Sequence, residues 1–303
     1  MLKICFSRTV PWPKLAFKDA IKNLTFGGYV IGEGMAWYAF VTMDIVIAGK
    51  FWPAEVLGVY ALAVQVVSMP LNRTLPLIKS VALPAYSRSM IQDRSLLEAH
   101  TAKGLKLSLL LSVPMFWGAA ATAALIVPVF LGEKWLSAIL PFAFLCMCAP
   151  FRFLIELLSP AVVVAGYPDQ LFKKAVMISF VMLIFYFIVV LNSTSPALLA
   201  AVWMTVYPAI ALYASQRYCS LLNISFMTIM KGIFPVITSG LLMLFVVALL
   251  TLNLLDTMSN MLLLGLTVVT GFLVYVGTLY VTDRAVLYEL LSMYRGSKTA
   301  SRT

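Results

Sequence analysis

The stretch GIFPVITSGLLMLFVVALLTLNL, residues 232–254, contains no charged side chain. About 20 consecutive apolar residues are enough for an α-helix to cross the hydrocarbon core of a bilayer. A helix also satisfies its own backbone donors and acceptors where no water is present. This stretch therefore predicts a transmembrane helix.

Similar apolar blocks recur along the rest of the chain. They are far longer than the ~10-residue strand of a membrane barrel, and they show no sustained two-residue alternation. We therefore predict an all-α integral membrane protein with about eight transmembrane helices. The seven other expected crossings cover residues 25–49, 55–80, 105–131, 136–164, 172–191, 196–215 and 258–282.

The composition agrees with a bilayer environment. Of the 303 residues, 62% are hydrophobic and 11% are charged, whereas soluble globular chains are about half apolar and a quarter charged. The net charge of +10 could indicate nucleic-acid binding, which relies on clustered Lys and Arg. Here the basic residues lie in short segments between apolar blocks, so we expect contact with anionic lipid and no nucleic-acid partner.

The positions of the basic residues predict the orientation of the chain, because Lys and Arg accumulate on the cytoplasmic side of membrane proteins. With the N-terminus inside, most of the 22 basic residues are cytoplasmic, and the outer loops contain only Lys50 and Lys134. We therefore expect both termini, residues 1–24 and 283–303, in the cytoplasm. The longest inner connection, residues 86–104, is expected to be a polar, partly helical linker, with Ser95 opening a short helix.

Few residues are suited to covalent chemistry or metal binding. The chain has a single histidine, His100, which excludes a His-based metal site or catalytic dyad. The cysteines are too scattered for a disulfide framework or a spaced zinc site. We expect no catalytic residue, no metal and no cofactor. The four cysteines are Cys5, Cys146, Cys148 and Cys219.

Ionisable side chains at bilayer depth are costly unless they are paired or hydrated, so each is a candidate for a transport path. Glu33 and Asp44 lie eleven positions apart and share one face of the first helix. Arg152 and Glu156 stand four positions apart and can pair with each other. Three roles are open for Asp44: a helix-terminal group, a ligand of a coupling ion, or a folding contact.

Arg73 lies in a helix that contains Pro70, Pro76 and Pro84, each of which removes a backbone hydrogen bond or bends the helix. Together with its polar neighbours Asn72 and Thr74, Arg73 is expected to face a water-filled cavity. Two roles are open for it: contact with a ligand, or pairing with an acidic residue of another helix such as Glu33.

Three stretches in this order and spacing resemble the second half of polysaccharide flippases of the multidrug/oligosaccharidyl-lipid/polysaccharide exporter superfamily. The resemblance is clear over about residues 25–175 and rests on hydropathy alone beyond that. Asp44 and Gly49 match a D-x-x-I-x-G motif, and Gly58 and Tyr60 match L-G-x-Y. The stretches are MDIVIAGKFWPAEVLGVYALAVQVVSMPLNRTLPLIKSVALPAYSRSM (43–90), FLGEKWLSAILPFAFLC (130–146) and LSPAVVVAGYPDQLFKKA (158–175).

This resemblance implies a function. It implies translocation of an undecaprenyl-pyrophosphate-linked oligosaccharide, a polysaccharide or lipopolysaccharide precursor, across the bacterial inner membrane by alternating access between two lobes. In that scheme the path residues are expected among Arg73, Arg152, Glu33, Asp44 and Glu156, with Arg73 and Arg152 contacting pyrophosphate or acidic sugars. Membrane lipid and other polysaccharide-assembly proteins are the further partners that it implies.

The resemblance also divides the chain. Residues 25–215 correspond to one six-helix lobe, and residues 216–282 correspond to a terminal pair of helices. A first lobe of the family is not found in this sequence. We therefore expect a truncated chain that transports only as a dimer or together with a separate first lobe.

Two other functions are consistent with the sequence. A cation-coupled multidrug exporter of the same superfamily would depend on Glu33 or Asp44 and would tolerate replacement of Arg73 and Arg152. A membrane glycosyltransferase of the same pathway usually needs acidic or histidine groups on sizeable outer loops. The outer loops here are short, and a non-enzymatic exporter is therefore the favoured function.

The predicted topology can be tested at the turn that follows Asn192, which is expected to lie outside the cytoplasm. A single cysteine placed there should react with a membrane-impermeant maleimide in intact cells. If the site is shielded in intact cells and reacts only after lysis, the orientation derived from the basic residues is wrong.

Overall fold

The computed structural model describes residues 17–92, 94–255 and 257–284. Within these ranges the chain forms helices and no strands. The long helices are α1 (Phe17–Phe51), α2 (Ala54–Gln92), α3 (Arg94–Ala121), α5 (Ile139–Val164), α6 (Pro168–Asn192), α7 (Pro196–Leu222), α8 (Phe226–Leu254) and α9 (Asn260–Thr282).

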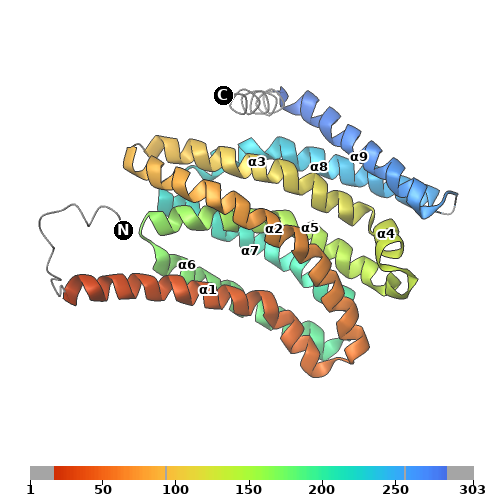
Figure 1. Cartoon of the computed structure of the whole chain (residues 1–303), viewed down its shortest axis with the longest axis horizontal. Coiled ribbons are helices and arrows are strands. Elements are labelled where there is room, and N and C mark those ends of the chain that lie inside the picture. The colour runs from red at the N-terminus through yellow and green to blue at the C-terminus, as the bar shows by residue number, and fades with distance from the viewer. Residues whose placement is uncertain (1–16, 93, 256, 285–303) are drawn as a thin grey trace, which may run out of the picture.

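All eight of these described helices are long and apolar enough to cross a membrane. They run back and forth, so that consecutive helices are antiparallel (Figure 1). The prediction of an all-α, multi-pass integral membrane protein is thus confirmed. The turn between α3 and α5 contains the short helix α4 (Ala123–Ile126), the π-helix η2 (Val127–Leu131) and the 3-10 helix η3 (Glu133–Ala138).

Several helices extend beyond the predicted crossings. The expected polar linker over residues 86–104 is wrong, because α2 continues to Gln92 and α3 begins at Arg94, with residue 93 outside the described part. Ser95 therefore lies inside a helix and does not open one. The helical backbone needs no apolar side chains once it leaves the hydrocarbon, so hydropathy marks the crossing and not the end of the helix.

The predicted segment boundaries do not all coincide with the ends of helices. Residue 215, the expected end of the six-helix lobe, falls within α7, which ends at Leu222. The N-terminal segment is described only from Phe17, where α1 begins. The C-terminal tail is described only to residue 284.

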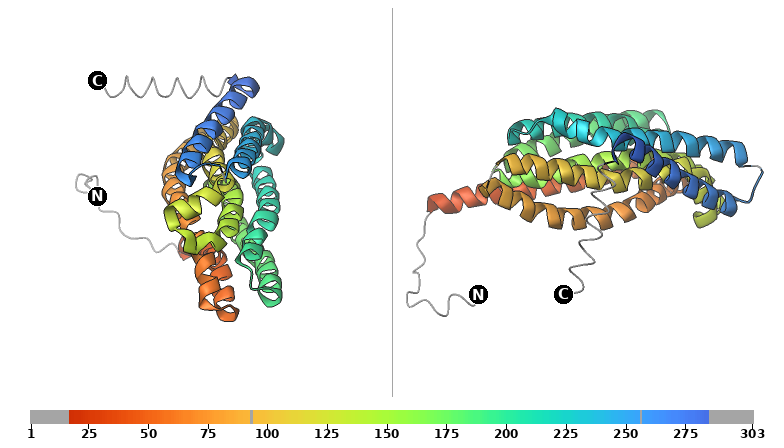
Figure 2. Two further views of the ribbon diagram at one scale, coloured as in Figure 1. Left: turned by 90° about the vertical axis from the view of Figure 1, so that its right-hand side faces the viewer. Right: turned by 90° about the horizontal axis from the view of Figure 1, so that it is seen from above.

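Helix α5 occupies the middle of the bundle and is the most deeply buried membrane helix of the described chain. It packs against α2, α3 and α7. Helix α1 packs mainly against α6 on one side, and α8 joins α3 and α9 on the other (Figures 1 and 2). The bundle therefore has α5 at its core and the α8–α9 pair attached through α3.

Side-chain donors bond to backbone carbonyls of distant segments at several points. Trp52 Nε1 donates to the carbonyl of Ser193 at 3.0 Å, and Trp117 Nε1 donates to that of Met147 at 3.1 Å. Tyr275 Oη donates to the carbonyl of Leu110 at 3.1 Å, which joins α9 to α3. These bonds give the polar ends of large aromatic side chains a partner inside an apolar bundle.

Helices α3 and α8 approach each other closely at Gly240. A Cβ atom at this position would lie 2.2 Å from Val113 Cγ1 and 2.9 Å from Trp117 Cε3. Neither neighbour moves away easily, because Val is restricted at χ1 and Trp117 is bonded to α5. Small residues at such contacts let membrane helices pack backbone against backbone.

We predict that Gly240→Ala destabilises the protein in spite of the better helix propensity of alanine. The forced shift at the α3–α8 contact should cost about 1–3 kcal/mol, against a gain of about 1 kcal/mol from propensity. Gly232→Ala is the matched control, because it lies on the same helix with no atom within 4 Å of its Cβ position. Thermal melting in detergent measures the difference, and equal melting temperatures of the two variants would contradict the close approach.

Candidate functional site

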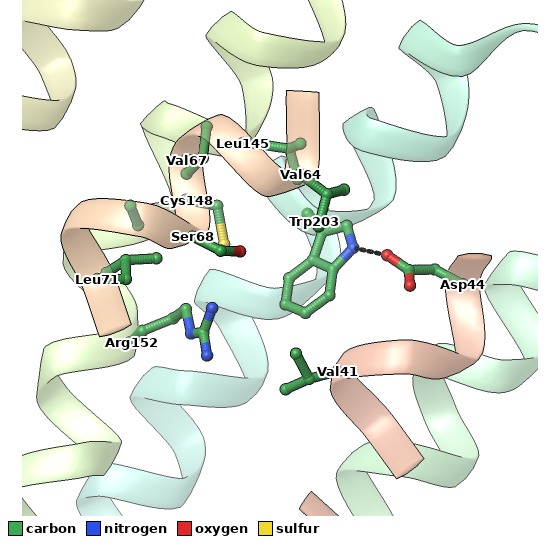
Figure 3. Close-up of a pocket in the computed structure, with 11 residues that line it drawn as sticks. Val41, Asp44, Val64, Val67, Ser68, Leu71, Leu145, Cys148, Arg152 and Trp203 are labelled. Atoms are coloured by element: carbon green, nitrogen blue, oxygen red, sulfur yellow. Dashed lines mark hydrogen bonds between the residues drawn. The ribbon is translucent and has the colours of Figure 1, made fainter. Parts of the chain in front are cut away.

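Asp44 lies on the inner face of α1 and is completely buried. Its carboxylate accepts three hydrogen bonds. Tyr60 Oη donates to Oδ2 at 2.6 Å, Trp203 Nε1 donates to the same oxygen at 3.0 Å, and the Ile45 amide donates to Oδ1 at 2.7 Å (Figure 3 shows the bond from Trp203). A buried carboxylate is stable only when such donors replace its hydration.

These bonds bring together two of the sequence motifs. Asp44 opens the D-x-x-I-x-G motif on α1, and Tyr60 closes the L-G-x-Y motif on α2. At Gly49 a Cβ atom would lie 3.3 Å from Leu57 Cδ2, whereas at Gly58 nothing lies within 4 Å. Gly49 thus permits the close approach of α2, and steric packing does not explain Gly58.

A small cavity of about 30 Å³ lies beside Asp44. It is large enough for a single water molecule. Its polar lining comes from Asp44, Ser68, Arg152 and the indole of Trp203, which belong to α1, α2, α5 and α7 (Figure 3). The cavity therefore places an acid and a base of distant helices at one site.

Arg152 points toward this cavity from α5 (Figure 3) and is 9% exposed. Its guanidinium carbon lies 5.7 Å from the ring centre of Trp37, a cation–π distance. Its Nε is buried without a hydrogen-bond partner, and no carboxylate of the described chain forms an ion pair with it. Arg152 is therefore a buried cation in contact with an aromatic ring and a water-sized cavity.

The expected pair between Arg152 and Glu156 is not formed. Glu156 instead forms an ion pair with Lys79 of α2. Four positions along a helix allow a pair but do not require one, and the packing of α2 against α5 brings Lys79 to the same carboxylate. Lys79, whose side chain is 40% exposed, therefore has a charged partner on α5.

Glu33 lies on the same face of α1 as Asp44 but about three helical turns away along the axis. It is partly buried and close enough to interact electrostatically with Glu156 and Lys79. The candidate residues thus form two groups, one around Asp44 and Arg152 and one around Glu156, Lys79 and Glu33. In the described ranges no three His, Cys, Asp or Glu side chains are grouped so that they could hold a metal ion.

Arg73 belongs to neither group. It lies near the middle of α2 and is exposed on the outer surface of the bundle, as are Gln65 and Asn72. Residues 65, 72 and 73 are seven and eight positions apart, about two helical turns, and so share a face. A polar stripe at this depth is unusual on a surface that elsewhere carries large apolar side chains such as Leu262, Leu252 and Phe272.

Sequence reasoning missed the aromatic partners of the buried charges. Trp203 is separated from Asp44 by 159 positions, and Trp37 lies on a different helix from Arg152. Tyr60 was recognised as part of a motif, but its hydrogen bond to Asp44 was not predicted. Nothing in the spacing of single helices indicates which indole or hydroxyl meets which charge.

Comparison with known proteins tests the family resemblance of the chain. The family model described as "Polysaccharide biosynthesis protein" matches residues 1–140. The resemblance to polysaccharide exporters is confirmed. None of the solved structures matches the chain.

Curated proteins that are similar to this chain have names from polysaccharide biosynthesis. The teichuronic acid biosynthesis protein TuaB of Bacillus subtilis (strain 168) is 27% identical over 115 residues, 38% of this chain and 24% of the relative. The lipopolysaccharide biosynthesis protein WzxC of Escherichia coli (strain K12) is 28% identical over 149 residues, 48% and 30% of the two chains. The amylovoran biosynthesis protein AmsL of Erwinia amylovora is 31% identical over 110 residues, 36% and 28%.

The matched part and the candidate site overlap only in part. The chain spans less than a third of the length of these relatives. Asp44, Tyr60 and Arg73 lie within the residues matched by the family model, and Arg152, Glu156 and Trp203 lie beyond residue 140. The family model therefore covers α1, α2 and α3 but not the parts of α5 and α7 that complete the buried site.

We predict that Asp44→Ala lowers stability markedly, because Tyr60 Oη and Trp203 Nε1 would both be left buried without an acceptor. Each unsatisfied donor should cost about 1–3 kcal/mol. Asp44→Asn, which keeps a carbonyl acceptor, should cost less. Thr42→Ala is the control on the same helix, because its hydroxyl bonds only to carbonyls of its own helix. Detergent melting curves would contradict the prediction if Asp44→Ala matched the wild type.

Proposed function

We propose that the chain takes part in moving a lipid-linked oligosaccharide, the precursor of a surface polysaccharide, across the bacterial inner membrane without covalent chemistry. The names of the relatives support a role in polysaccharide biosynthesis. The eight membrane helices and their few polar groups are suited to translocation. The undecaprenyl pyrophosphate carrier and the sugar class are part of this proposal.

The observation that carries the proposal is the polar stripe of Gln65, Asn72 and Arg73 on the exposed face of α2. An arginine in contact with hydrocarbon at mid-depth is costly, and such residues face water or protein in membrane proteins. We infer that this face of α2 borders an aqueous path, alone or together with a second lobe. The planar guanidinium of Arg73 can hold a phosphate oxygen pair through two hydrogen bonds.

Arg152 supplies a second cation on the inner side of α2. It has no carboxylate partner in the described part of the chain, so its charge is available to an anion that reaches the cavity beside Asp44. Movement of α2 relative to α5 would expose Arg152 to the same path as Arg73. Pro70 and Pro76, which flank Arg73, give α2 points at which it can bend.

The basic end of the bundle is proposed to be cytoplasmic, with both termini on that side. The described helix ends there carry Arg88, Lys103, Lys106, Lys173, Lys174, Arg217 and Lys231, whereas the opposite end carries Lys50 and Lys134. This distribution follows the excess of Lys and Arg in cytoplasmic loops.

The test uses the bacterium that encodes the chain. Deletion of the gene should reduce surface polysaccharide and cause its lipid-linked precursor to accumulate. Arg73→Gln and Arg152→Gln should each reproduce much of this loss at normal protein abundance, because each removes one cation from the path. Arg88→Gln is the matched control, since Arg88 is an exposed arginine at the end of the same helix.

Each outcome decides the proposal. Normal polysaccharide in the deletion strain would contradict it. Normal export in both arginine variants, with loss of drug resistance in Glu33→Gln or Asp44→Asn, would instead indicate a cation-coupled multidrug exporter. Accumulation of a precursor that lacks sugars, in place of the complete lipid-linked unit, would indicate a glycosyltransferase step.

A further inference from the structure

The half of α2 that follows Pro76 has a point at which it can bend. Pro76 has no N–H group, so the carbonyl of Asn72 lacks its helical hydrogen bond. Beyond the proline, Leu77 and Leu83 are 68% and 44% exposed. This half of the helix therefore has a hinge at its start and a largely exposed outer face.

The packing of this segment against α3 is loose. A groove of about 460 Å³ lies between them, and small residues contribute to its walls, Ala82 on α2 and Gly104 on α3. Side chains that border open space lose the dispersion contacts that a packed neighbour would supply. On the α3 side, few contacts therefore oppose a displacement of the segment.

An ion pair fastens the same segment to α5. Lys79, three positions beyond Pro76, pairs with Glu156. The carboxylate side chain is only 10% exposed, and a carboxylate buried to this degree is costly without its partner. The pair therefore favours the position in which the segment lies against α5.

The ion pair lies between the cavity beside Arg152 and the basic end of the bundle. On α2, Lys79 is eight positions beyond Leu71, which lines the cavity, or roughly 12 Å along the axis. On α5, which runs parallel to α2, Glu156 is four positions beyond Arg152, or roughly 6 Å. Pro76 falls between Leu71 and Lys79, so bending there moves the paired half of α2 and leaves the cavity wall in place.

We propose that the Lys79–Glu156 ion pair is a latch that keeps the half of α2 beyond Pro76 closed over the cavity beside Arg152. When the pair breaks, this half bends away from α5, and water and small solutes reach the cavity from the basic end of the bundle. The inference goes beyond the proposed export, because it concerns the opening of the bundle and not what the bundle carries.

Cys148 reports the opening, because it lines the cavity and is buried in the closed chain. The full chain is purified in detergent with Cys5, Cys146 and Cys219 replaced by alanine. Mass spectrometry measures the rate at which N-ethylmaleimide modifies Cys148. Lys79→Gln should raise this rate about fivefold, the ratio expected for loss of a partly exposed ion pair.

Two further chains show whether the attraction between the charges is responsible. Lys79→Glu combined with Glu156→Lys places opposite charges at the same two positions, and it should return the rate to nearly that of the wild type. Lys173→Gln is the matched control, because the pair of Lys173 with Asp169 lies within α6 and joins no two helices. It should leave the rate unchanged.

The hinge is tested in the Lys79→Gln chain. Pro76→Ala restores the N–H group that bonds to the Asn72 carbonyl and should slow the modification of Cys148 again. Pro84→Ala removes a proline of the same helix that lies beyond the latch, and it should not slow the modification.

Four results would overturn the proposal: an unchanged rate in Lys79→Gln, an equal rise in Lys173→Gln, no recovery in the chain with reversed charges, or a fast rate that persists with Pro76→Ala. A matching rise in a chain with Cys146 as its only cysteine would also contradict it. Cys146 is buried on α5 outside the cavity lining, so its exposure would mean that the whole bundle loosens. None of these results depends on whether the chain exports a polysaccharide.

Discussion

The buried carboxylate of Asp44 is the contact on which the arrangement of the central helices depends. Inside a bilayer a charged oxygen cannot recover its hydration, so the protein has to supply donors. Tyr60 and Trp203 do this from α2 and α7, and the three helices are held together by one side chain. The bonds also explain why an acidic residue on α1 and a tyrosine on α2 belong to the two motifs.

The charges within the membrane-spanning part have different environments. Asp44 is satisfied by neutral donors, and Glu156 is paired with Lys79. Arg152 has an aromatic ring and a small cavity as its neighbours, and Arg73 is exposed on α2. A charge that is fully satisfied holds the fold, whereas a charge without a counterion can attract an anion. This contrast separates the two arginines from the acids and supports their place on the proposed path.

The α8–α9 pair is attached by different means. Close packing at Gly240 joins α8 to α3, the hydroxyl of Tyr275 bonds to α3, and Lys106 of α3 pairs with Asp283 just after α9. At Gly271 a Cβ atom would lie 3.0 Å from Val247 Cγ2, so α8 and α9 also approach closely. Dispersion and a few interhelical bonds thus hold this pair, since lipid supplies no hydrophobic drive between helices.

The sequence by itself determined that the helices lie in a lipid bilayer, how many of them cross it, and that consecutive helices are antiparallel, which follows from the short turns. It did so because each apolar block must satisfy its own backbone, which is a local requirement that hydropathy reports. The same locality explains the error over residues 86–104, where a helix continues after its apolar side chains end. The candidate charges were also found locally, since any ionisable residue inside an apolar block is conspicuous.

Only the tertiary structure decided which partner each charge has. Glu156 pairs with Lys79 and not with Arg152, Asp44 is bonded to Trp203 from a helix far along the chain, and Arg73 faces outward. These outcomes depend on the rotation and spacing of whole helices, which are set by packing at positions such as Gly49 and Gly240. A sequence of nearly uniform apolar blocks carries little information about that rotation, because many faces of such helices are equally apolar.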